Sequence, residues 1–264
     1  MMPEPHAAGS TRLDSDVTIV ISSYNQAEYL GEAVASALAQ TVPCRVVVVD
    51  DGSADGSADL AVGLGVETVR LPHQGALETF RAAVDLVTTP FYCLLNGDDV
   101  IEPTYVERTR PEMAGARVGF VYTGVRLFGE MEGMLPARPF DAGALRWSNF
   151  AHGASLVRTD AYRSVGGFDP AFEDHHEDWA LWVAMVAQGW TGAPVDEPLL
   201  RYRQRAGSRT PRHPFEFERA RWRIARRHLC FYGPYGFARL LGSAAKRRVS
   251  NLASMGAVGS SSTL

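Results

Sequence analysis

Four consecutive valines, at positions 46–49, limit the fold of this chain more than any other sequence feature. β-branched residues favour extended backbone, so a strand is predicted at residues 45–49. The run has no polar alternation, and strands buried on both faces occur in parallel sheets covered by helices. Residues 17–22 and 91–95 form two further short apolar runs. We therefore expect an α/β fold built on a mostly parallel sheet.

Helical patterns separate these strands along the first hundred residues. Apolar residues recur at helical spacing over residues 27–40. Further helices are predicted after Ser57 and over residues 75–87, with another strand at residues 66–71. This alternation of strand and helix is typical of a doubly wound, Rossmann-like sheet flanked by helices.

The second half of the chain has a weaker pattern of short elements. The predicted helices lie at residues 102–113, 159–165 and 177–188, and the predicted strands at residues 117–122, 125–128, 154–157 and 198–202. Residues 129–150 lack periodicity, which predicts an irregular, mobile segment. From Pro211 onward we expect an arginine-rich helical extension, broken at Gly233-Pro234.

Charge and cysteine content indicate the cellular compartment of the chain. The net charge is −4, yet nine of the 26 basic residues and none of the 30 acidic residues follow Glu218. The cysteines Cys44, Cys93 and Cys230 are far apart and odd in number, which predicts free thiols in a reducing compartment. The first 16 residues lack an apolar signal core, and no apolar run approaches the roughly 20 residues that span a bilayer. We therefore expect a cytoplasmic protein.

Polar residues follow the predicted strand at residues 91–95 directly. The strand stops at Asn96-Gly97, a turn dipeptide, and two adjacent carboxylates, Asp98 and Asp99, come next. Ligands of open α/β sheets bind beyond the carboxyl ends of the strands. Adjacent carboxylates repel each other unless a cation or hydrogen-bond donors hold them charged, and Mg²⁺ and Mn²⁺ prefer oxygen ligands. Taken alone, the turn is equally compatible with a solvated acidic loop.

Four motifs stand in a fixed order at the ends of predicted elements: Ser22-Ser23-Tyr24-Asn25, Asp50-Asp51-Gly52-Ser53, Asn96-Gly97-Asp98-Asp99, and Gly167-Phe168-Asp169 followed by Glu177-Asp178. In this order they resemble glycosyltransferase family 2, whose members are inverting enzymes with the GT-A nucleotide-sugar fold. The resemblance covers roughly residues 16–202. It implies a hexosyltransferase-type enzyme that uses a nucleotide sugar.

The resemblance implies a role for each matching residue on the donor side. Tyr24 would pack against the nucleobase, with Ser22 beside it. Asp51 would accept the ring N–H of the base, which suits uracil or thymine. Asp98 would approach the ribose or the metal, and Asp99 would bind Mn²⁺ or Mg²⁺ on the donor diphosphate.

On the acceptor side, the resemblance makes Asp178 the general base. A carboxylate near the anomeric carbon would take the proton of the attacking hydroxyl, and one base without an enzyme nucleophile means single displacement with inversion. Glu177 beside it, and His152 in the same half of the chain, are the candidate acceptor contacts. Asp51 could instead cap a helix, and Glu177 and Asp178 could be first-turn acids favoured by the helix dipole.

Two positions depart from the family's pattern. Many members carry Asp where this chain has Asn96, and a late His that helps to hold the metal is replaced by Arg205. An arginine is always protonated, so it cannot bind a cation, but it can pair with a diphosphate through two hydrogen bonds. We therefore expect a metal site centred on Asp99, with Arg203 or Arg205 taking part of the diphosphate charge.

These observations predict five segments and one reaction. The segments are a disordered leader at 1–15, a GT-A domain at 16–210 with a nucleotide-binding half at 16–100 and an acceptor half at 101–210, a basic helical extension at 211–250, and a disordered tail at 251–264. The predicted enzyme moves a sugar from a UDP- or dTDP-sugar to a hydroxyl acceptor, which can be a saccharide, a lipid-linked saccharide or a small metabolite. No nucleic-acid partner is expected.

Two other functions and one further partner stay open. The rivals are a nucleotidyltransferase on a similar fold and a non-catalytic sugar-nucleotide binder. A nucleotidyltransferase would favour a glycine-rich phosphate loop with Lys or Arg after the first strand, where this chain has Ser-Tyr-Asn-Gln-Ala-Glu. The basic extension interleaves arginines with aromatic residues, so it could contact an anionic membrane at its inner face, or it could pair with the acidic body.

Overall fold

The structure is a computed structural model that describes residues 15–173, 175–205 and 214–242. It divides into two compact units, Met1–Arg212 and His213–Leu264, and each is described by itself. The predicted leader at 1–15, apart from Ser15, and the predicted tail at 251–264 lie outside the described residues.

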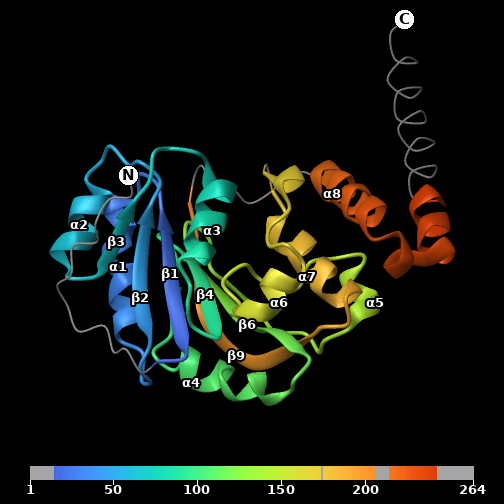
Figure 1. Cartoon of the computed structure of the whole chain (residues 1–264), viewed down its shortest axis with the longest axis horizontal. Coiled ribbons are helices and arrows are strands. Elements are labelled where there is room, and N and C mark those ends of the chain that lie inside the picture. Colours follow the sequence, from blue (N-terminus) through green and yellow to red (C-terminus); the bar gives the residue numbers. More distant parts are fainter. Residues whose placement is uncertain (1–14, 174, 206–213, 243–264) are drawn as a thin grey trace, which may run out of the picture. The chain divides into compact units, whose positions relative to one another are not determined.

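Strands and helices alternate through the first hundred residues, as predicted (Figure 1). The elements are β1 (Val17–Ser23), α1 (Ala27–Leu38), β2 (Arg45–Asp50), α2 (Ser57–Gly63), β3 (Glu67–Arg70), α3 (Ala76–Asp85) and β4 (Phe91–Asn96). The four valines of β2 are at most 4% exposed, which confirms burial on both faces of the strand. Burial of each such side chain contributes about 1.5–3 kcal/mol.

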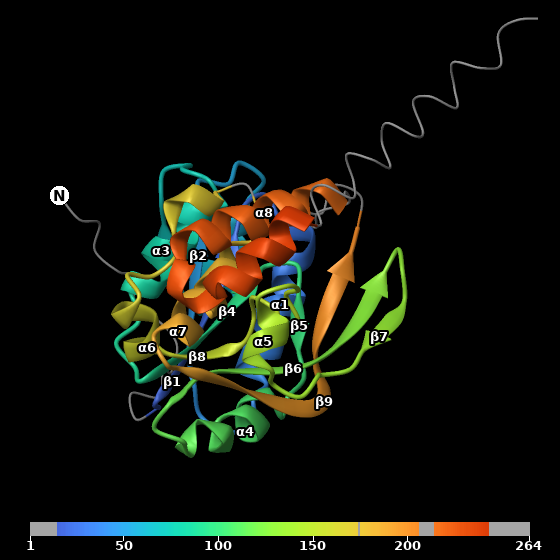
Figure 2. The same cartoon turned by 90° about the vertical axis from the view of Figure 1, so that its right-hand side faces the viewer.

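Shorter elements and two long strands make up the rest of the first unit. They are β5 (Val100–Ile101), α4 (Tyr105–Thr109), the 3₁₀ helix η1 (Pro111–Ala114), β6 (Val118–Gly129), β7 (Gly133–Leu135), α5 (Ala142–Leu145), β8 (Leu156–Arg158), α6 (Thr159–Ser164), the 3₁₀ helix η2 (Pro170–Phe172), α7 (Glu177–Ala187) and β9 (Thr191–Gln204). Figure 2 shows β6, β7 and the end of β9 extending together from the sheet.

Four predicted elements were wrong in extent. The helix at 102–113 is split into α4 and η1, because Pro111 lacks an amide hydrogen and cannot continue an α-helix. The strands at 117–122 and 125–128 are one strand, β6, with register shifts on both sides of Gly124. The strand at 198–202 is the end of the 14-residue β9. Pro194 and Pro198 contradict a strand pattern in the sequence. Pro198 lies opposite Gly124, where the register shifts on both sides, whereas Pro194 lies opposite Tyr122 in a regularly paired part of the strand.

The segment at 129–150 is more regular than predicted. It contains β7, which pairs with β6, and the short helix α5. The side chain of Asp141 caps α5, because its Oδ1 atom accepts hydrogen bonds from the backbone N–H groups of Gly143 (2.7 Å) and Ala144 (3.1 Å).

The described strands form one sheet with the order β3-β2-β1-β4-β8-β6-β9-β5, and β7 pairs with β6. The four longest pairings, β1 with β2, β1 with β4, β2 with β3 and β6 with β9, are parallel. In the register of β1, Ser23 lies opposite Asp50 and Ser22 lies opposite Asn96. Three of the four sequence motifs therefore begin at neighbouring strand ends, on one edge of the sheet.

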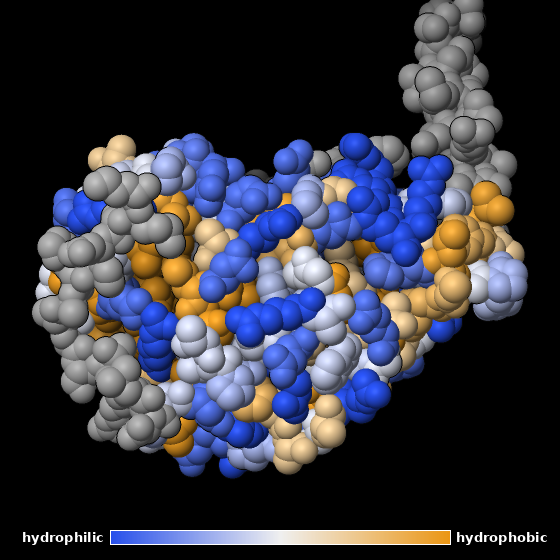
Figure 3. Space-filling model, viewed as in Figure 1, coloured by the Kyte–Doolittle hydropathy of each residue, from blue (hydrophilic) through white to orange (hydrophobic). Residues whose placement is uncertain are grey.

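The second unit contains α8 (Pro214–Arg227) followed by helical backbone at residues 229–242. Gly233 has a φ of 62° and precedes Pro234, so the regular helical geometry is interrupted at the predicted position. The unit exposes Leu229, Tyr235 and Leu241, and Figure 3 shows apolar residues on its surface beside hydrophilic ones. Among the described residues, no helix is both long and apolar enough to cross a membrane.

Candidate active site

The turn after β4 places Asp98 and Asp99 beside the ends of β1 and β9. The backbone N–H of Gly97 donates to the carbonyl oxygen of Ser22 at 2.8 Å. A Cβ at Gly97 would lie 2.7 Å from Oε1 of Gln26 and 3.1 Å from the carbonyl oxygen of Ser22, so a larger residue would require the Gln26 side chain to move. Asn96 donates its side-chain N–H to Oδ2 of Asp99 at 3.0 Å. An amide at position 96 thus stabilises the second carboxylate, where a third acid would repel it.

Asp99 is a buried acid, 1% exposed. Its Oδ1 atom accepts a hydrogen bond of 2.9 Å from the backbone N–H of Arg203, on β9. Burial first, and the charge of Asp98 second, raise the pKa of Asp99 to about 8. Hydrogen bonds from Arg203 and Asn96 oppose this rise. The carboxylate is therefore held in place, and it lacks a full compensating positive charge among the described residues.

Two arginines at the end of β9 surround the acidic turn, at the positions expected from the sequence. The guanidinium of Arg203 donates to the carbonyl oxygen of Asp98 and to Oε2 of Glu32, both at 2.8 Å. It packs between the rings of Tyr29 (4.7 Å) and Phe128 (4.3 Å), and its side chain is only 13% exposed. Most of the Arg203 side chain is therefore engaged in contacts that hold the turn in place.

Arg205 is the more available of the two. Its Nε atom lies 2.8 Å from Oδ2 of Asp98, and its side chain is 31% exposed. The guanidinium also lies over the ring of Tyr29, at 5.5 Å, so the side chain is partly exposed beside the acidic turn. A diphosphate held there would meet a positive charge, and a divalent ion would meet the acids.

Asp98 and Asp99 fit a divalent cation that prefers oxygen ligands and binds few carboxylates. They offer hard oxygen ligands on adjacent residues, and the raised pKa of Asp99 marks a carboxylate that a cation would compensate. No cluster of three or more His, Cys, Asp or Glu side chains suited to a metal occurs in the described part of the chain. The donor set therefore suits Mg²⁺ or Mn²⁺ that takes one or two carboxylates and completes its shell with phosphate oxygens and water.

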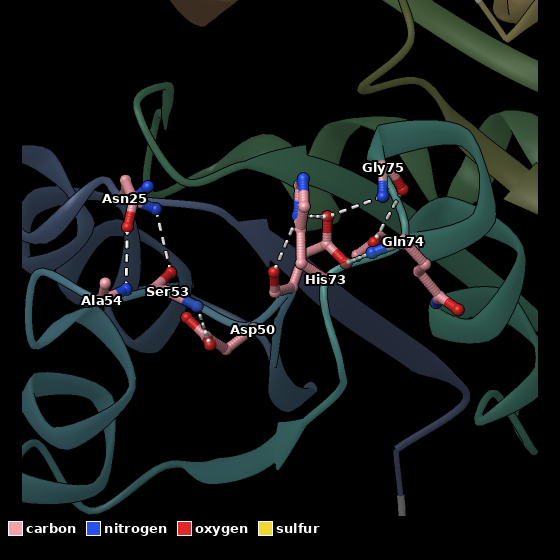
Figure 4. A network of polar contacts seen from close by, with 9 residues as sticks. Asn25, Asp50, Ser53, Ala54, His73, Gln74 and Gly75 are labelled. Atoms are coloured by element: carbon pink, nitrogen blue, oxygen red, sulfur yellow. Dashed lines mark hydrogen bonds and ion pairs between the residues drawn. The ribbon is translucent and has the colours of Figure 1, made fainter.

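Asp51, after β2, is tied to the segment that begins α3, whose residues His73, Gln74 and Gly75 are labelled in Figure 4. Its carboxylate accepts hydrogen bonds from the backbone N–H groups of Gln74 (2.9 Å) and Gly75 (3.0 Å), and Nδ1 of His73 lies 3.0 Å from Oδ2. The side chain is 3% exposed. Asp51 thus anchors the start of α3. It does not cap α2, the helix that directly follows β2.

Tyr24 is exposed and stacked on an unexpected partner. Its ring lies 4.1 Å from the ring of His73, at an interplanar angle of 15°, and the residue is 45% exposed. His73 therefore joins Tyr24 and Asp51 in one group. His73 was not identified from the sequence. Its position two residues before Gly75, which opens α3, could have indicated that it lies at the site. Ser22, near the end of β1, is buried.

Asp178 stands in the first turn of α7 on the acceptor side. Its Oδ2 atom accepts a hydrogen bond of 2.9 Å from the side chain of Asn149, and its Oδ1 atom accepts one of 2.6 Å from the backbone N–H of Trp179. Burial first, and the charge of Glu177 second, raise the pKa of Asp178 to about 7. A carboxylate with this pKa can accept a proton near neutral pH.

His152 lies on the segment that packs near α7. Its Nε2 atom lies 3.2 Å from the hydroxyl of Thr123 and 3.3 Å from the backbone N–H of the same residue. Burial lowers the pKa of His152 to about 4, so the imidazole is neutral at pH 7. Its Nδ1 atom is shielded and has no hydrogen-bond partner in the described part of the chain. The next residue, Gly153, borders Asp178, because a Cβ there would lie 3.9 Å from Cβ of Asp178.

Comparison with known proteins settles the family. The sequence model of glycosyl transferase family 2 matches residues 18–157, a little over half of the chain. The chain belongs to glycosyl transferase family 2. The matched region contains the nucleotide-side motifs and His152, and it ends before Asp178.

Two curated relatives match over shorter stretches than the family model. The uncharacterized glycosyltransferase alr2836 of Nostoc sp. is 34% identical over 99 residues, which are 35% of this chain and 31% of the relative. The succinoglycan biosynthesis protein ExoO of Rhizobium meliloti is 34% identical over 110 residues, which are 39% of this chain and 32% of the relative. The aligned parts thus span about a third of either relative.

Solved structures confirm the GT-A fold. Staphylococcus aureus TarS (residues 1–349) in complex with UDP-GlcNAc superposes with a TM-score of 0.67 at 15% identity, covering 79% of this chain and 65% of TarS. The mannosyltransferase PcManGT of Pyrobaculum calidifontis in complex with GDP-Man and Mn²⁺ has a TM-score of 0.59 at 18% identity, covering 99% and 80%. At these identities the likeness concerns the fold, so the predicted fold class is confirmed.

Proposed function

We propose that this chain is an inverting glycosyltransferase that moves a sugar from a UDP- or dTDP-sugar to a hydroxyl acceptor. The observation that carries the proposal is the Asp178 carboxylate. It is anchored at both oxygen atoms and has a pKa of about 7, which suits a general base. Membership in glycosyl transferase family 2 supports the reaction class.

The proposed reaction is a single displacement. Asp178 takes the proton of the acceptor hydroxyl as its oxygen forms a bond to the anomeric carbon of the donor sugar. The bond from that carbon to the diphosphate oxygen breaks on the opposite face, so the configuration inverts. The leaving nucleoside diphosphate carries away the bonding electrons, and its growing negative charge needs stabilisation.

Residues around the turn after β4 would stabilise the negative charge of the leaving diphosphate. Asp99 and Asp98 would hold Mn²⁺ or Mg²⁺, and a bound divalent ion supplies charge stabilisation of the leaving diphosphate. Arg205 would pair with the diphosphate oxygens, because it is more exposed than Arg203 and already lies at this turn. Arg203 would keep the turn in shape through its bonds to Asp98 and Glu32.

The strand ends of β1 and β2 would take the nucleoside. The exposed ring of Tyr24 offers a stacking surface for a base, Ser22 would lie beside the base, and the anchored carboxylate of Asp51 would accept a ring N–H. TarS binds UDP-GlcNAc, whereas PcManGT binds GDP-Man, so the fold accommodates more than one base.

On the acceptor side, we propose contacts from Glu177, which precedes the base in α7, and from His152, whose neighbour Gly153 borders the base. ExoO is named for succinoglycan biosynthesis, which favours a saccharide acceptor in polysaccharide assembly for this chain too. The arginine-rich second unit would bring the enzyme to an anionic membrane, where lipid-linked acceptors reside.

A thermal-shift panel of nucleotide sugars tests the donor. The panel contains UDP-, dTDP- and GDP-sugars, each with and without Mn²⁺. A ligand that binds only the folded state raises the melting temperature. A shift with UDP- or dTDP-sugars supports the proposed donor, and a shift with GDP-sugars alone rejects it. Release of nucleoside diphosphate without acceptor then separates an enzyme from a binder.

A further inference from the structure

The proposed base is held by a residue that lies outside the family motifs. The side-chain N–H of Asn149 donates to Oδ2 of Asp178 at 2.9 Å, across 29 positions of the sequence. The backbone N–H of Trp179 donates to Oδ1 at 2.6 Å. Each carboxylate oxygen therefore has one anchor, and the two anchors together prevent rotation of the group.

Asn149 is itself fixed by its own segment. Its Oδ1 atom accepts a hydrogen bond of 3.3 Å from the backbone N–H of Ala151. With the amide oxygen engaged in this way, the amide nitrogen is the atom that points to Asp178. The side chain therefore presents a donor, rather than an acceptor, to the carboxylate.

Two buried tryptophans of α7 attach the same segment to the helix of the base. Nε1 of Trp179 donates to the carbonyl oxygen of Leu145 at 2.7 Å, and Nε1 of Trp182 donates to that of Ala151 at 3.1 Å. Both indoles are at most 1% exposed. These bonds bracket Asn149 on both sides, so its distance from Asp178 is set by the packed core.

The electrostatic surroundings of Asp178 make this donor important. Burial first, and the charge of Glu177 second, favour the protonated acid, while the backbone N–H of Trp179 and then the Asn149 amide favour the carboxylate. His152, on the segment packed against α7, is neutral at pH 7 and supplies no compensating charge. Asn149 is therefore the side chain that contributes most to keeping Asp178 ionised.

We propose that Asn149 is a positioning residue for sugar transfer, holding the Asp178 carboxylate ionised and oriented toward the acceptor hydroxyl. The proposal rests on the proposed function, since it assumes that Asp178 is the base. Asn149 acts through Asp178 and does not itself take the proton.

The test replaces Asn149 in a graded series. Asn149→Ala removes the donor, and the isosteric Asn149→Asp places a second carboxylate against Asp178. We expect the pKa of Asp178 to rise by about one unit in the first variant and further in the second. Carbon-13 NMR of labelled aspartate follows the titration without any ligand, and the signal is assigned by its loss in Asp178→Asn.

Turnover supplies the second readout. The probe is release of nucleoside diphosphate from the nucleotide sugar that gives the largest thermal shift, measured from pH 6 to pH 9. We expect Asn149→Ala to lose about tenfold in rate at pH 6–7 and to recover toward the unmodified rate at high pH. Ser148→Ala is the matched control, because the Ser148 hydroxyl donates to the Asn149 carbonyl oxygen, at 3.4 Å, and its loss leaves the Asn149 amide in place.

The outcomes separate the role of the base from the role of its positioning residue. Asp178→Asn with normal turnover rejects the proposed base. Impaired Asp178→Asn together with Asn149 variants that titrate and react like the unmodified chain rejects the positioning role alone. A loss of rate that is equal at every pH, with an unchanged Asp178 titration, also overturns the inference, because it marks a structural role. If Asn149→Ala does not fold, the isosteric Asn149→Asp carries both measurements, and an unchanged titration in that variant rejects the positioning role.

Discussion

Arg205 and Asp98 form an ion pair of 2.8 Å that joins the end of β9 to the turn after β4. By the resemblance seen in the sequence, Arg205 would take the place of a metal-binding His. Its pairing with Asp98 means that, before any donor binds, part of the acidic turn is already neutralised. A donor diphosphate that attracts Arg205 would release Asp98 for a cation, so the two ligands would assist each other.

We expect Arg205→Ala to change nucleotide and metal binding in opposite directions. Loss of a charge-assisted bond to the diphosphate weakens UDP binding by about tenfold or more. Mn²⁺ binding without UDP becomes tighter, because Asp98 no longer has an ion-pair partner. Isothermal calorimetry with Mn²⁺, with UDP and with both measures each affinity.

Arg201→Ala is the matched control for this variant. Arg201 is on the same strand, and its guanidinium stacks on the ring of Phe128 at 4.7 Å. Unchanged UDP affinity in Arg205→Ala would refute the diphosphate role. Tight Mn²⁺ binding by the unmodified chain without UDP would refute the two-carboxylate site, since such sites depend on substrate phosphates.

We expect Asp178→Asn to lower turnover by about 10²-fold or more while donor binding stays near normal. The amide has the shape of the acid but cannot take the acceptor's proton. In the unmodified chain the rate should fall as the pH drops below about 7, because the raised pKa leaves Asp178 protonated there. Asp160→Asn, an exposed acid on α6, is the control. Normal turnover in Asp178→Asn would direct attention to Glu177 or Asp169.

We expect Tyr24→Ala to weaken UDP binding by about tenfold, and Tyr24→Phe to leave it nearly unchanged. Stacking on a base needs the aromatic ring and not the hydroxyl. The ring of Tyr24 is exposed on one side of its stack with His73. Calorimetric titration with UDP compares the two variants, and equal weakening in both would argue against a stacking role.

Much of the nucleotide side could be predicted from the sequence because its signals are local. Uninterrupted apolar runs identify the strands of a parallel sheet, and acids directly after them must lie at its carboxyl edge. Asp98 and Asp99 are adjacent in the chain, so their mutual repulsion needed no structure. Arg203 and Arg205, by contrast, were located only through the family resemblance.

The remaining site residues could not be found because their contacts join distant parts of the chain. Asn149 reaches Asp178 across 29 positions, His73 reaches Asp51 across 22, and Arg203 reaches Glu32 across 171. No periodicity links such partners. The full length of β9 was missed for a different reason. Pro194 and Pro198 contradict the strand pattern, and the register shift that accommodates Pro198 opposite Gly124 leaves no signal in the sequence.

We expect the arginine-rich second unit to bind anionic lipid. Exposed Leu229, Tyr235 and Leu241 accompany exposed Arg219 and Arg226, which is the composition of a helical surface that binds anionic lipid. We expect the full chain to co-sediment with vesicles that contain anionic phospholipid, and less with neutral vesicles or at high salt, because each basic residue near such a surface contributes about 1 kcal/mol.

Two changes test the source of this binding. A chain cut after Arg212 removes the unit, and the double variant Arg219→Glu, Arg226→Glu keeps the unit but reverses two charges. Both should lose co-sedimentation, while the melting shift with nucleotide sugar checks that the first unit is intact.

The predicted contributors Lys246, Arg247 and Arg248 lie outside the described residues. The truncation removes them, and the double variant keeps them. Equal, negligible sedimentation of all three proteins would end the membrane proposal, because the basic unit would then make no measurable contact with anionic lipid.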